Sequence, residues 1–180
     1  MTRRIAVRSV LAALSAAALG TAFAAPASTP AAPEAKAAFE RLKGLVGTWE
    51  GTAGDAQNAM PVKLVYEVTG NGSAVKETLF PGTPHEMLTL YHLDGPSLVL
   101  THYCAAGNQP RMKLARAVAG PPYELVFDFA GGSNLDAAKD MHMHSARIRL
   151  LEDGRMESEW ASFQGGKQSD VKKFTVSRKK

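Results

Sequence analysis

The sequence lacks most of the patterns that mark known catalytic and metal-binding sites. It contains one cysteine, Cys104, which excludes an internal disulfide and the paired cysteines of a structural zinc site. The G-x-S-x-G motif of serine hydrolases, the H-E-x-x-H motif of metalloproteases and a glycine-rich phosphate-binding loop are all missing. These absences favour a protein without catalytic activity over an enzyme. We expect Cys104 to be a small buried residue.

The first 24 residues have the pattern of a secretory signal peptide. Three arginines within the first eight residues precede an apolar run at 10–19, and Ala22-Phe23-Ala24 supplies small residues at the cleavage site. The run is too short to anchor the chain in a membrane. We therefore predict a Sec-type signal cleaved after Ala24 and a periplasmic or secreted mature protein with no stable membrane anchor.

The mature chain is predicted to be a single, nearly neutral domain. Cleavage removes three arginines and no acids, so the formal net charge falls from +4 to +1, which does not favour nucleic-acid binding. Removing residues 1–24 from 180 leaves 156, a length that suits one domain with one core. Residues 25–33, rich in Ala and Pro, are predicted to be a disordered linker, and residues 34–180 the domain.

The spacing of apolar residues changes from helical to alternating after Gly47. Residues 34–45 have the period of a short amphipathic helix. Alternation and turn residues then predict ten strands, at 48–53, 61–68, 74–80, 87–93, 97–104, 111–118, 123–129, 141–151, 155–163 and 170–177. Short turns between successive strands predict an antiparallel meander, which removes its edges by closing. The predicted fold is therefore all-β, an antiparallel up-and-down barrel of about ten strands with a short N-terminal helix, and such a barrel can hold a small ligand.

The segment FERLKGLVGTWEGTA (39–53) resembles the opening of lipocalin-like, or calycin, β-barrels, in which a short helix precedes a Gly-x-Trp strand. The match lies in Gly47-Thr48-Trp49. It implies a structural role for Gly47 and Trp49, with the tryptophan packing across the closed end of the barrel. Most of the mature chain, including LTHYCAAGNQPRM (100–112), resembles a family of bacterial exported proteins of this type.

A more distant resemblance is to nitrobindin-like barrels, which bind haem. Their opening reads Gly-x-Trp-x-Gly-x-Gly-x-Gly, whereas this chain has Ala53 where the next glycine belongs. Their axial histidine lies near the C-terminus, whereas two predicted strands follow His144, the last histidine of this chain. The resemblance therefore does not imply haem binding here.

Alternation within the strands assigns candidate ligand-binding residues to the barrel interior. Two arginines mark one face of segment 141–151 as solvent, which places His142 and His144 on the inner face. The strand at 87–93 has apolar residues on both faces. The other residues expected to line a ligand site are Leu90, His92, Leu100, His102, Arg116, Phe127 and Trp160. An inward Arg116 would bind a carboxylate or phosphate group of the ligand.

Four functions remain open on this sequence. The first is an interior site for a small apolar or amphipathic molecule, with no cofactor. The second is a haem or metal protein that uses His142 or His144. The two side chains would lie ~6.5–7 Å apart on one face of a strand and could chelate one metal ion with a third ligand from another strand. The third is an enzyme that uses a histidine of the same pocket as general base. The fourth is a filled barrel whose surface binds a partner, with each histidine hydrogen-bonded to backbone or water. No pattern in the sequence identifies the ligand or predicts the oligomeric state.

Overall fold

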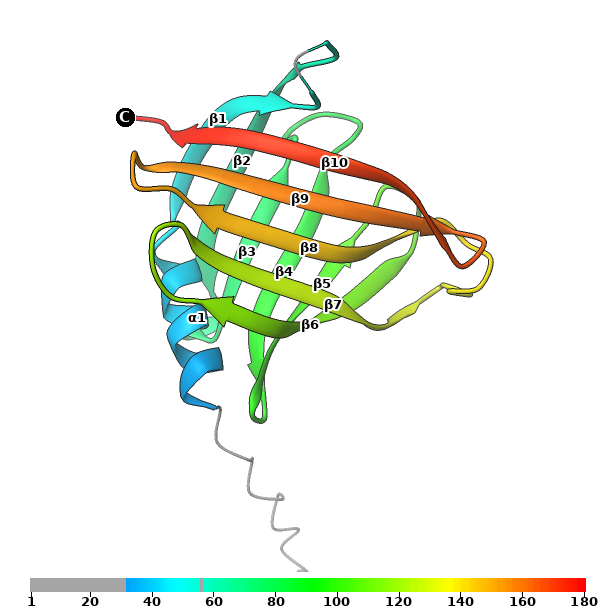
Figure 1. The fold of residues 1–180 in the computed structure, drawn as a ribbon, viewed down its shortest axis with the longest axis horizontal. Helices are drawn as coiled ribbons and strands as arrows, with labels where there is room; N and C mark the ends of the chain where they lie inside the picture. Colours follow the sequence, from blue (N-terminus) through cyan, green and yellow to red (C-terminus); the bar gives the residue numbers. More distant parts are fainter. Residues whose placement is uncertain (1–31, 56) are drawn as a thin grey trace, which may run out of the picture.

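The structure is a computed structural model that describes residues 32–55 and 57–180 (Figure 1). The predicted signal peptide and all of the predicted linker except residues 32 and 33 lie outside the described residues. Helix α1 (Pro33–Lys43) begins with a proline at its first turn, where the missing N–H is not needed. Its buried face carries Ala38, Phe39 and Leu42. Among the described residues, no helix is long and apolar enough to cross a membrane.

Ten antiparallel strands form one closed barrel, in which β1 pairs with both β2 and β10 and every other strand pairs with its neighbours in the sequence. The strands are β1 (Gly47–Ala53), β2 (Met60–Thr69), β3 (Ala74–Leu79), β4 (Met87–Asp94), β5 (Ser97–Tyr103), β6 (Gln109–Val118), β7 (Tyr123–Ser133), β8 (His142–Leu150), β9 (Arg155–Gln164) and β10 (Lys167–Arg178). The predicted antiparallel barrel with a short N-terminal helix is confirmed.

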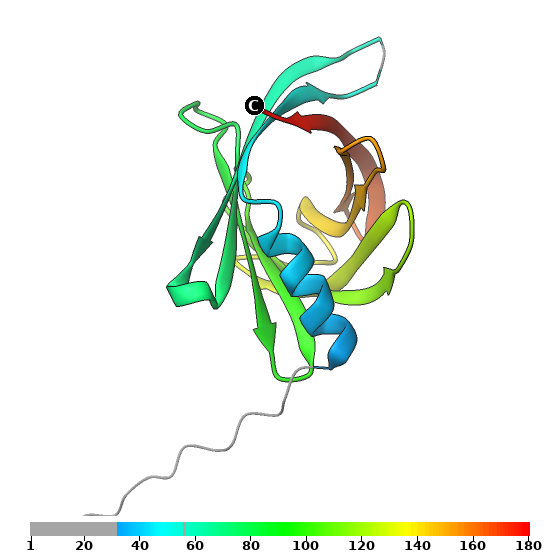
Figure 2. The same ribbon diagram turned by 90° about the vertical axis from the view of Figure 1, so that its left-hand side faces the viewer.

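The two ends of the barrel differ. Helix α1 lies across one end, as Figure 2 shows. There the amide of Ala32 donates to the carbonyl of Pro96 at 3.1 Å, and the amide of Ala117 donates to Oε1 of Glu34 at 2.7 Å. Because the strands alternate in direction, the loops β1–β2, β3–β4, β5–β6, β7–β8 and β9–β10 gather at the opposite end, here called the open end.

Trp49 closes the end that α1 covers. Its side chain is buried, and its indole N–H donates to the carbonyl of Leu45 at 2.8 Å. The guanidinium of Arg178 lies 4.5 Å from the centre of the indole ring and donates to the carbonyl of Gly44 at 2.7 Å. Gly47 has φ of 129°, which favours glycine, and a Cβ there would lie 3.0 Å from this guanidinium. The end of β10 is thereby tied to the segment that joins α1 to β1.

Large side chains fill the centre of the barrel. A side chain that lined a void wide enough for water would keep accessible surface. Several of the largest inner side chains are instead 0 % exposed, namely Tyr91, Leu98, Leu100, Met112 and Phe127. The centre is therefore packed like an ordinary protein core. Two surface grooves, of about 460 and 370 Å³, lie outside the barrel. They are lined by the β6–β7 and β8–β9 loops, at the end that α1 covers.

Closure of the barrel requires a residue without a side chain at Gly51. A Cβ there would lie 2.1 Å from the carbonyl oxygen of Thr175, on β10. We predict that Gly51→Ala lowers the free energy of unfolding by about 2 kcal/mol or more, because backbone must move to relieve the clash. Urea denaturation measures this loss. The matched control Thr52→Ala, at an exposed position of the same strand, should change stability by less than about 0.5 kcal/mol. Equal stabilities of the two variants would contradict the close approach of β1 and β10.

Candidate functional site

Four of the predicted lining residues lie inside the barrel. Leu100, His102, Phe127 and Trp160 are all buried, on strands β5, β7 and β9. His102 is held by its Nδ1, which lies 3.0 Å from Oγ1 of Thr89, and its ring lies 5.2 Å from that of Trp160. Its Nε2 is buried and has no hydrogen-bond partner among the described residues. Since the surrounding core is packed, these residues line no open cavity of the kind expected from the sequence.

Leu90 and His92 lie on the outer face of β4, so their expected inward orientation is wrong. The inner row of this strand consists of Thr89 and Tyr91, both 0 % exposed, and alternate residues point to the opposite face. Leu90 and His92 are half-buried, and Nδ1 of His92 lies 3.1 Å from the carbonyl of Leu93. Because both faces of β4 carry apolar residues, its alternation does not identify the inner face.

Arg116 also points outward, and the expected inward anchor is wrong. Leu114 pairs with Phe127 and Arg116 with Val126, so Ala115 is an extra residue in a β-bulge. The bulge shifts the alternation and moves Arg116 to the outer face. There its guanidinium donates to Oε1 of Glu124 at 3.1 Å, and its side chain is 56 % exposed. A carboxylate or phosphate inside the barrel would meet no charge from this residue.

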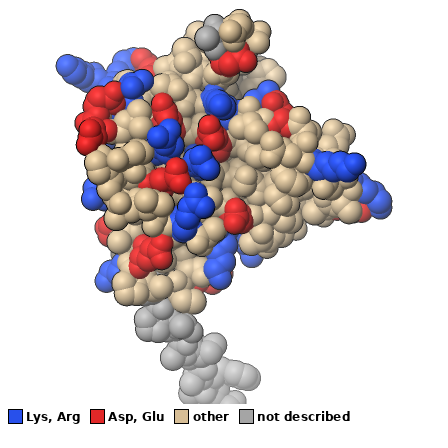
Figure 3. Space-filling view, in the orientation of Figure 1, with Lys and Arg blue, Asp and Glu red and all other residues tan. Residues whose placement is uncertain are grey.

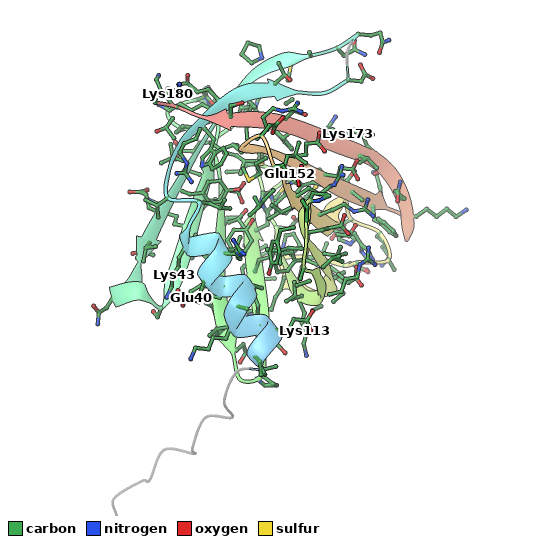
Figure 4. All side chains as sticks on the ribbon, turned by 60° about the vertical axis from the view of Figure 1, so that its left-hand side comes forward. Glu40, Lys43, Lys113, Glu152, Lys173 and Lys180 are labelled. Carbon is green, nitrogen blue, oxygen red and sulfur yellow. The ribbon has the colours of Figure 1, made fainter. Side chains whose placement is uncertain are left out.

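The outer face of the sheet around Arg116 carries mixed charges rather than a field of one sign. Arg149 donates to Glu157 at 2.8 Å, and Arg147 lies within 3.9 Å of Glu159. Figure 3 shows the positive and negative side chains interspersed over one face of the molecule. The same holds on α1, where Glu40 and Lys43 form an exposed pair at 2.9 Å (Figure 4). These two surfaces therefore have the mixed charge of ordinary solvated faces (Figure 3).

His142 and His144 lie at the open end, where strands β7 and β8 diverge. The pairing of these two strands ends at Asp128 and Ser145; beyond it, β7 continues along β6 and β8 along β9. The space between the diverging strands is occupied by the rings of Phe129, His142, His144 and Phe163, which we call the wedge.

A second β-bulge changes the orientation of the two histidines. Met143 pairs with Ser162 and Ser145 with Ala161, so His144 is an extra residue in β8. Met143 lies opposite Ser162, in the buried row of β9 that holds Trp160, and packs against the hydrophobic core. The prediction that His142 and His144 share the inner row with Ala146 is therefore wrong. Neither histidine is freely exposed, because His142 is 0 % exposed and His144 is half-buried.

Aromatic rings flank His144 on both sides. Its imidazole stacks on Phe163 of β9, with ring centres 3.8 Å apart and planes 17° apart. On the side of β7 it stacks on Phe129, with centres 4.7 Å apart and planes 16° apart. His142 lies beside both, with its ring centre 4.9 Å from that of Phe129 and 5.2 Å from that of His144. The imidazole of His144 is therefore held in one plane.

A chain of hydrogen bonds connects the two imidazoles to the backbone. Nδ1 of His142 lies 2.9 Å from the carbonyl oxygen of Asp140, and Nε2 of His142 lies 3.0 Å from Nδ1 of His144. Burial lowers the pKa of His144, and the neighbouring His142 lowers it further, whereas Asp128 opposes the shift. His144 is therefore neutral near pH 7.

This arrangement does not fit a metal chelated by both histidines, because Nε2 of His142 already bonds His144. Among residues 32–55 and 57–180, no three His, Cys, Asp or Glu side chains converge to hold a metal ion. The only nitrogen of the pair left for a metal is Nε2 of His144. Cys104, which is half-buried rather than buried, lies in the β5–β6 loop and contributes no ligand to the wedge.

Several residues of interest were not singled out from the sequence. Phe129 and Phe163, which flank His144, fell in predicted strands without a role. Asn108 donates from Nδ2 to the carbonyl of Met141 at 2.7 Å, and its Oδ1 is buried without a partner among the described residues. The wedge depends on strands that come together only in the fold, so no local motif marks it.

A buried carboxyl group was missed as well. Tyr91 donates to Oε2 of Glu77 at 2.6 Å, and a hydrogen bond from Tyr66 acts on the same carboxyl group. Burial raises the pKa of Glu77, which the two hydrogen bonds oppose. Glu77 alternates with Val75 and Leu79 in the inner row of β3, so an acid in an apolar row was the signal available in the sequence.

Comparison with known proteins shows the fold. The crystal structure of Rv2717c from M. tuberculosis is similar over 83 % of this chain and 99 % of that chain, with a TM-score of 0.53 and 15 % sequence identity. At this identity the likeness extends to the barrel fold alone. No family model matches the sequence, and no curated protein matches it. The lipocalin-like resemblance of the opening segment is thus supported at the level of the barrel and no further.

The buried neutral His102 should make stability depend on pH. Burial lowers its pKa to about 4, whereas an unfolded chain binds the proton near pH 6.5. Between these values the unfolded state holds more protons, so stability is lost as pH falls from about 6.5 to about 4. We predict that His102→Leu removes about 3 kcal/mol of this loss.

Urea denaturation at several pH values measures the effect. His92→Leu, at a half-buried histidine on the outer face, is the matched control and should keep the pH dependence of the parent. The contribution of His144 is the same in all three proteins and cancels in the differences. Parallel pH profiles for the parent and His102→Leu would show that His102 is not held neutral in the core.

Proposed function

We propose that this chain is an exported small-molecule-binding barrel whose ligand site is the wedge at its open end. The proposed occupant is a small, mainly apolar molecule with one polar group. The observation that carries the proposal is His144, a neutral imidazole held between two aromatic rings at a place that solvent reaches. Polar groups left without partners in such surroundings are costly and are typical of binding sites.

The accessibility of His144 follows from its surroundings. Its Nε2 forms no hydrogen bond with any described residue, yet it is not one of the buried unpartnered atoms, which are Nε2 of His102 and Oδ1 of Asn108. This nitrogen therefore keeps contact with solvent. Phe129 and Phe163 are half-buried and supply apolar surface beside it. Apolar walls with one oriented polar atom are the usual composition of a small-molecule site.

The packed centre argues for the wedge over the interior. A ligand in the centre would have to displace side chains such as Tyr91 and Phe127, which have no exposed surface. Opening such a core costs several kcal/mol. A ligand at the wedge would bind against the half-buried rings of Phe129, His144 and Phe163. An export signal, if cleaved as predicted, would deliver this site to the periplasm or the medium.

The alternatives have less support from the geometry. An enzyme would need a nucleophile or second catalytic group close to the bare nitrogen of His144, and no described side chain forms a hydrogen bond with this nitrogen. A divalent metal held by this pair would have to use this single nitrogen, because His142 is engaged by His144. We therefore derive no function through a divalent metal.

The proposal predicts that a small aromatic probe binds at the wedge. Titration of the ¹⁵N-labelled mature protein with 1-naphthol should shift amide resonances of residues 127–131, 141–146 and 161–164. Phe163→Ala should weaken binding about fivefold or more, because it removes one aromatic wall. His92→Ala, at a half-buried histidine outside the wedge, should leave the affinity unchanged. Shifts confined to the outer grooves at residues 118–122 and 151–155, or no shifts at all, would contradict the proposed site.

A further inference from the structure

We propose that the ligand of the wedge is an aromatic hydrogen-bond donor, either a neutral phenol or a protonated alkylamine that carries an aromatic ring, and not a carboxylate or phosphate. This inference rests on the proposed function and adds the chemical class of the ligand. It follows from the hydrogen-bond chain that ends at His144, which leaves an acceptor and no donor facing the solvent.

The first hydrogen bond of the chain fixes the proton of His142. A backbone carbonyl oxygen can only accept, so Nδ1 of His142, 2.9 Å from the oxygen of Asp140, must carry the hydrogen. A neutral imidazole has one N–H, so Nε2 of His142 is then an acceptor.

The second hydrogen bond determines which ring nitrogen of His144 carries the hydrogen. Because Nε2 of His142 accepts, Nδ1 of His144 at 3.0 Å must donate. The remaining nitrogen, Nε2 of His144, is therefore a bare lone pair. The order of donors and acceptors is set by the carbonyl of Asp140, so a neutral His144 cannot turn an N–H outward without breaking the chain. A ligand at this nitrogen must supply the hydrogen.

A second acceptor lies at the same end of the barrel. The carbonyl of Met141 can only accept, so the amide nitrogen of Asn108 must face it, which leaves Oδ1 as the free atom of that side chain. Oδ1 is buried and has no partner among the described residues. Met141 directly precedes His142, so Asn108 is bonded to the backbone next to the wedge. A ligand or water that satisfies Oδ1 must also donate.

The charges around the wedge disfavour an anion. Arg116, the expected anchor for an acidic ligand, lies on the outer face with Glu124. Asp128, next to Phe129 in β7, is exposed and is the acid that acts on His144. The faces of Phe129 and Phe163 carry partial negative charge and attract cations. An anionic ligand would face the lone pair of His144 unless this ring bound a proton, and its burial and the neighbouring His142, which lower its pKa, disfavour that proton.

Three naphthalene probes of equal ring size test the inference. 1-Naphthol is a neutral donor, 1-naphthylmethylamine a cationic donor and 1-naphthoate an anionic acceptor near neutral pH. In amide-shift titrations of the mature protein, the first two should bind at least about tenfold more tightly than the third. His144→Phe keeps an aromatic ring between Phe129 and Phe163 but removes the lone pair, and should reduce this selectivity to less than about threefold. His92→Phe is the matched control and should keep the full selectivity.

The outcomes of these titrations distinguish a failure of the proposed ligand class from a failure of the proposed binding function. Binding of 1-naphthoate as tight as that of 1-naphthol, with shifts at the wedge, overturns the ligand class and leaves the binding function standing. Absence of wedge shifts with all three probes overturns the proposed function and the ligand class with it. Retention of the parent selectivity by His144→Phe shows that another group selects the ligand. The comparison of probes on the parent protein stands even where a variant fails to fold.

Discussion

Closure between β1 and β10 is the constraint on which the rest of the structure depends. The two strands approach so closely at Gly51 that no side chain fits, and Arg178 and Trp49 lock the same junction at the end that α1 covers. A closed sheet has no free edge for pairing, and its inner rows must pack against one another. Here the largest inner side chains are fully buried, so we propose that a ligand binds at an end of the barrel and not in its centre. Since α1 covers one end (Figure 2), the proposed site lies at the open end.

The β-bulge at His144 sets the orientation of the two imidazoles at the open end. A regular β8 would have continued the inner row of Ala146 and Ile148 through His144, whereas the extra residue turns both imidazoles into the gap between β7 and β8. There they meet rings from the two flanking strands and connect to one backbone carbonyl. Bulges in barrels commonly re-aim side chains in this way near functional sites. The result is an imidazole with a fixed plane, a fixed proton and one free nitrogen.

The sequence predicts the fold far better than the site, and particular residues show why. Period-two alternation with turn residues such as Gly70 and Gly95 marks ten strands, and their short connections imply the meander and its closure. Assigning residues to the inner or outer face from the sequence requires an unbroken alternation along each strand. The bulge at Ala115 breaks the alternation just before Arg116, and the bulge at His144 breaks it between the two histidines and Ala146. A bulge has no reliable local signature, because it depends on how neighbouring strands pair. The predicted inward orientation of Leu90 and His92 is wrong for a different reason, because β4 carries apolar residues on its outer face as well as on its inner face.

The central claim is that His144 presents a bare Nε2 at the open end, with its proton on Nδ1. Two-bond ¹H–¹⁵N correlation spectra of the imidazole rings measure this directly in the ligand-free mature protein, with His144→Phe assigning the resonances. The account predicts an N–H at Nδ1 of His144, an unprotonated Nε2 near neutral pH, and a pKa for this ring below the ordinary value for histidine. A proton on Nε2, or a ring that is charged near neutral pH, would contradict the account.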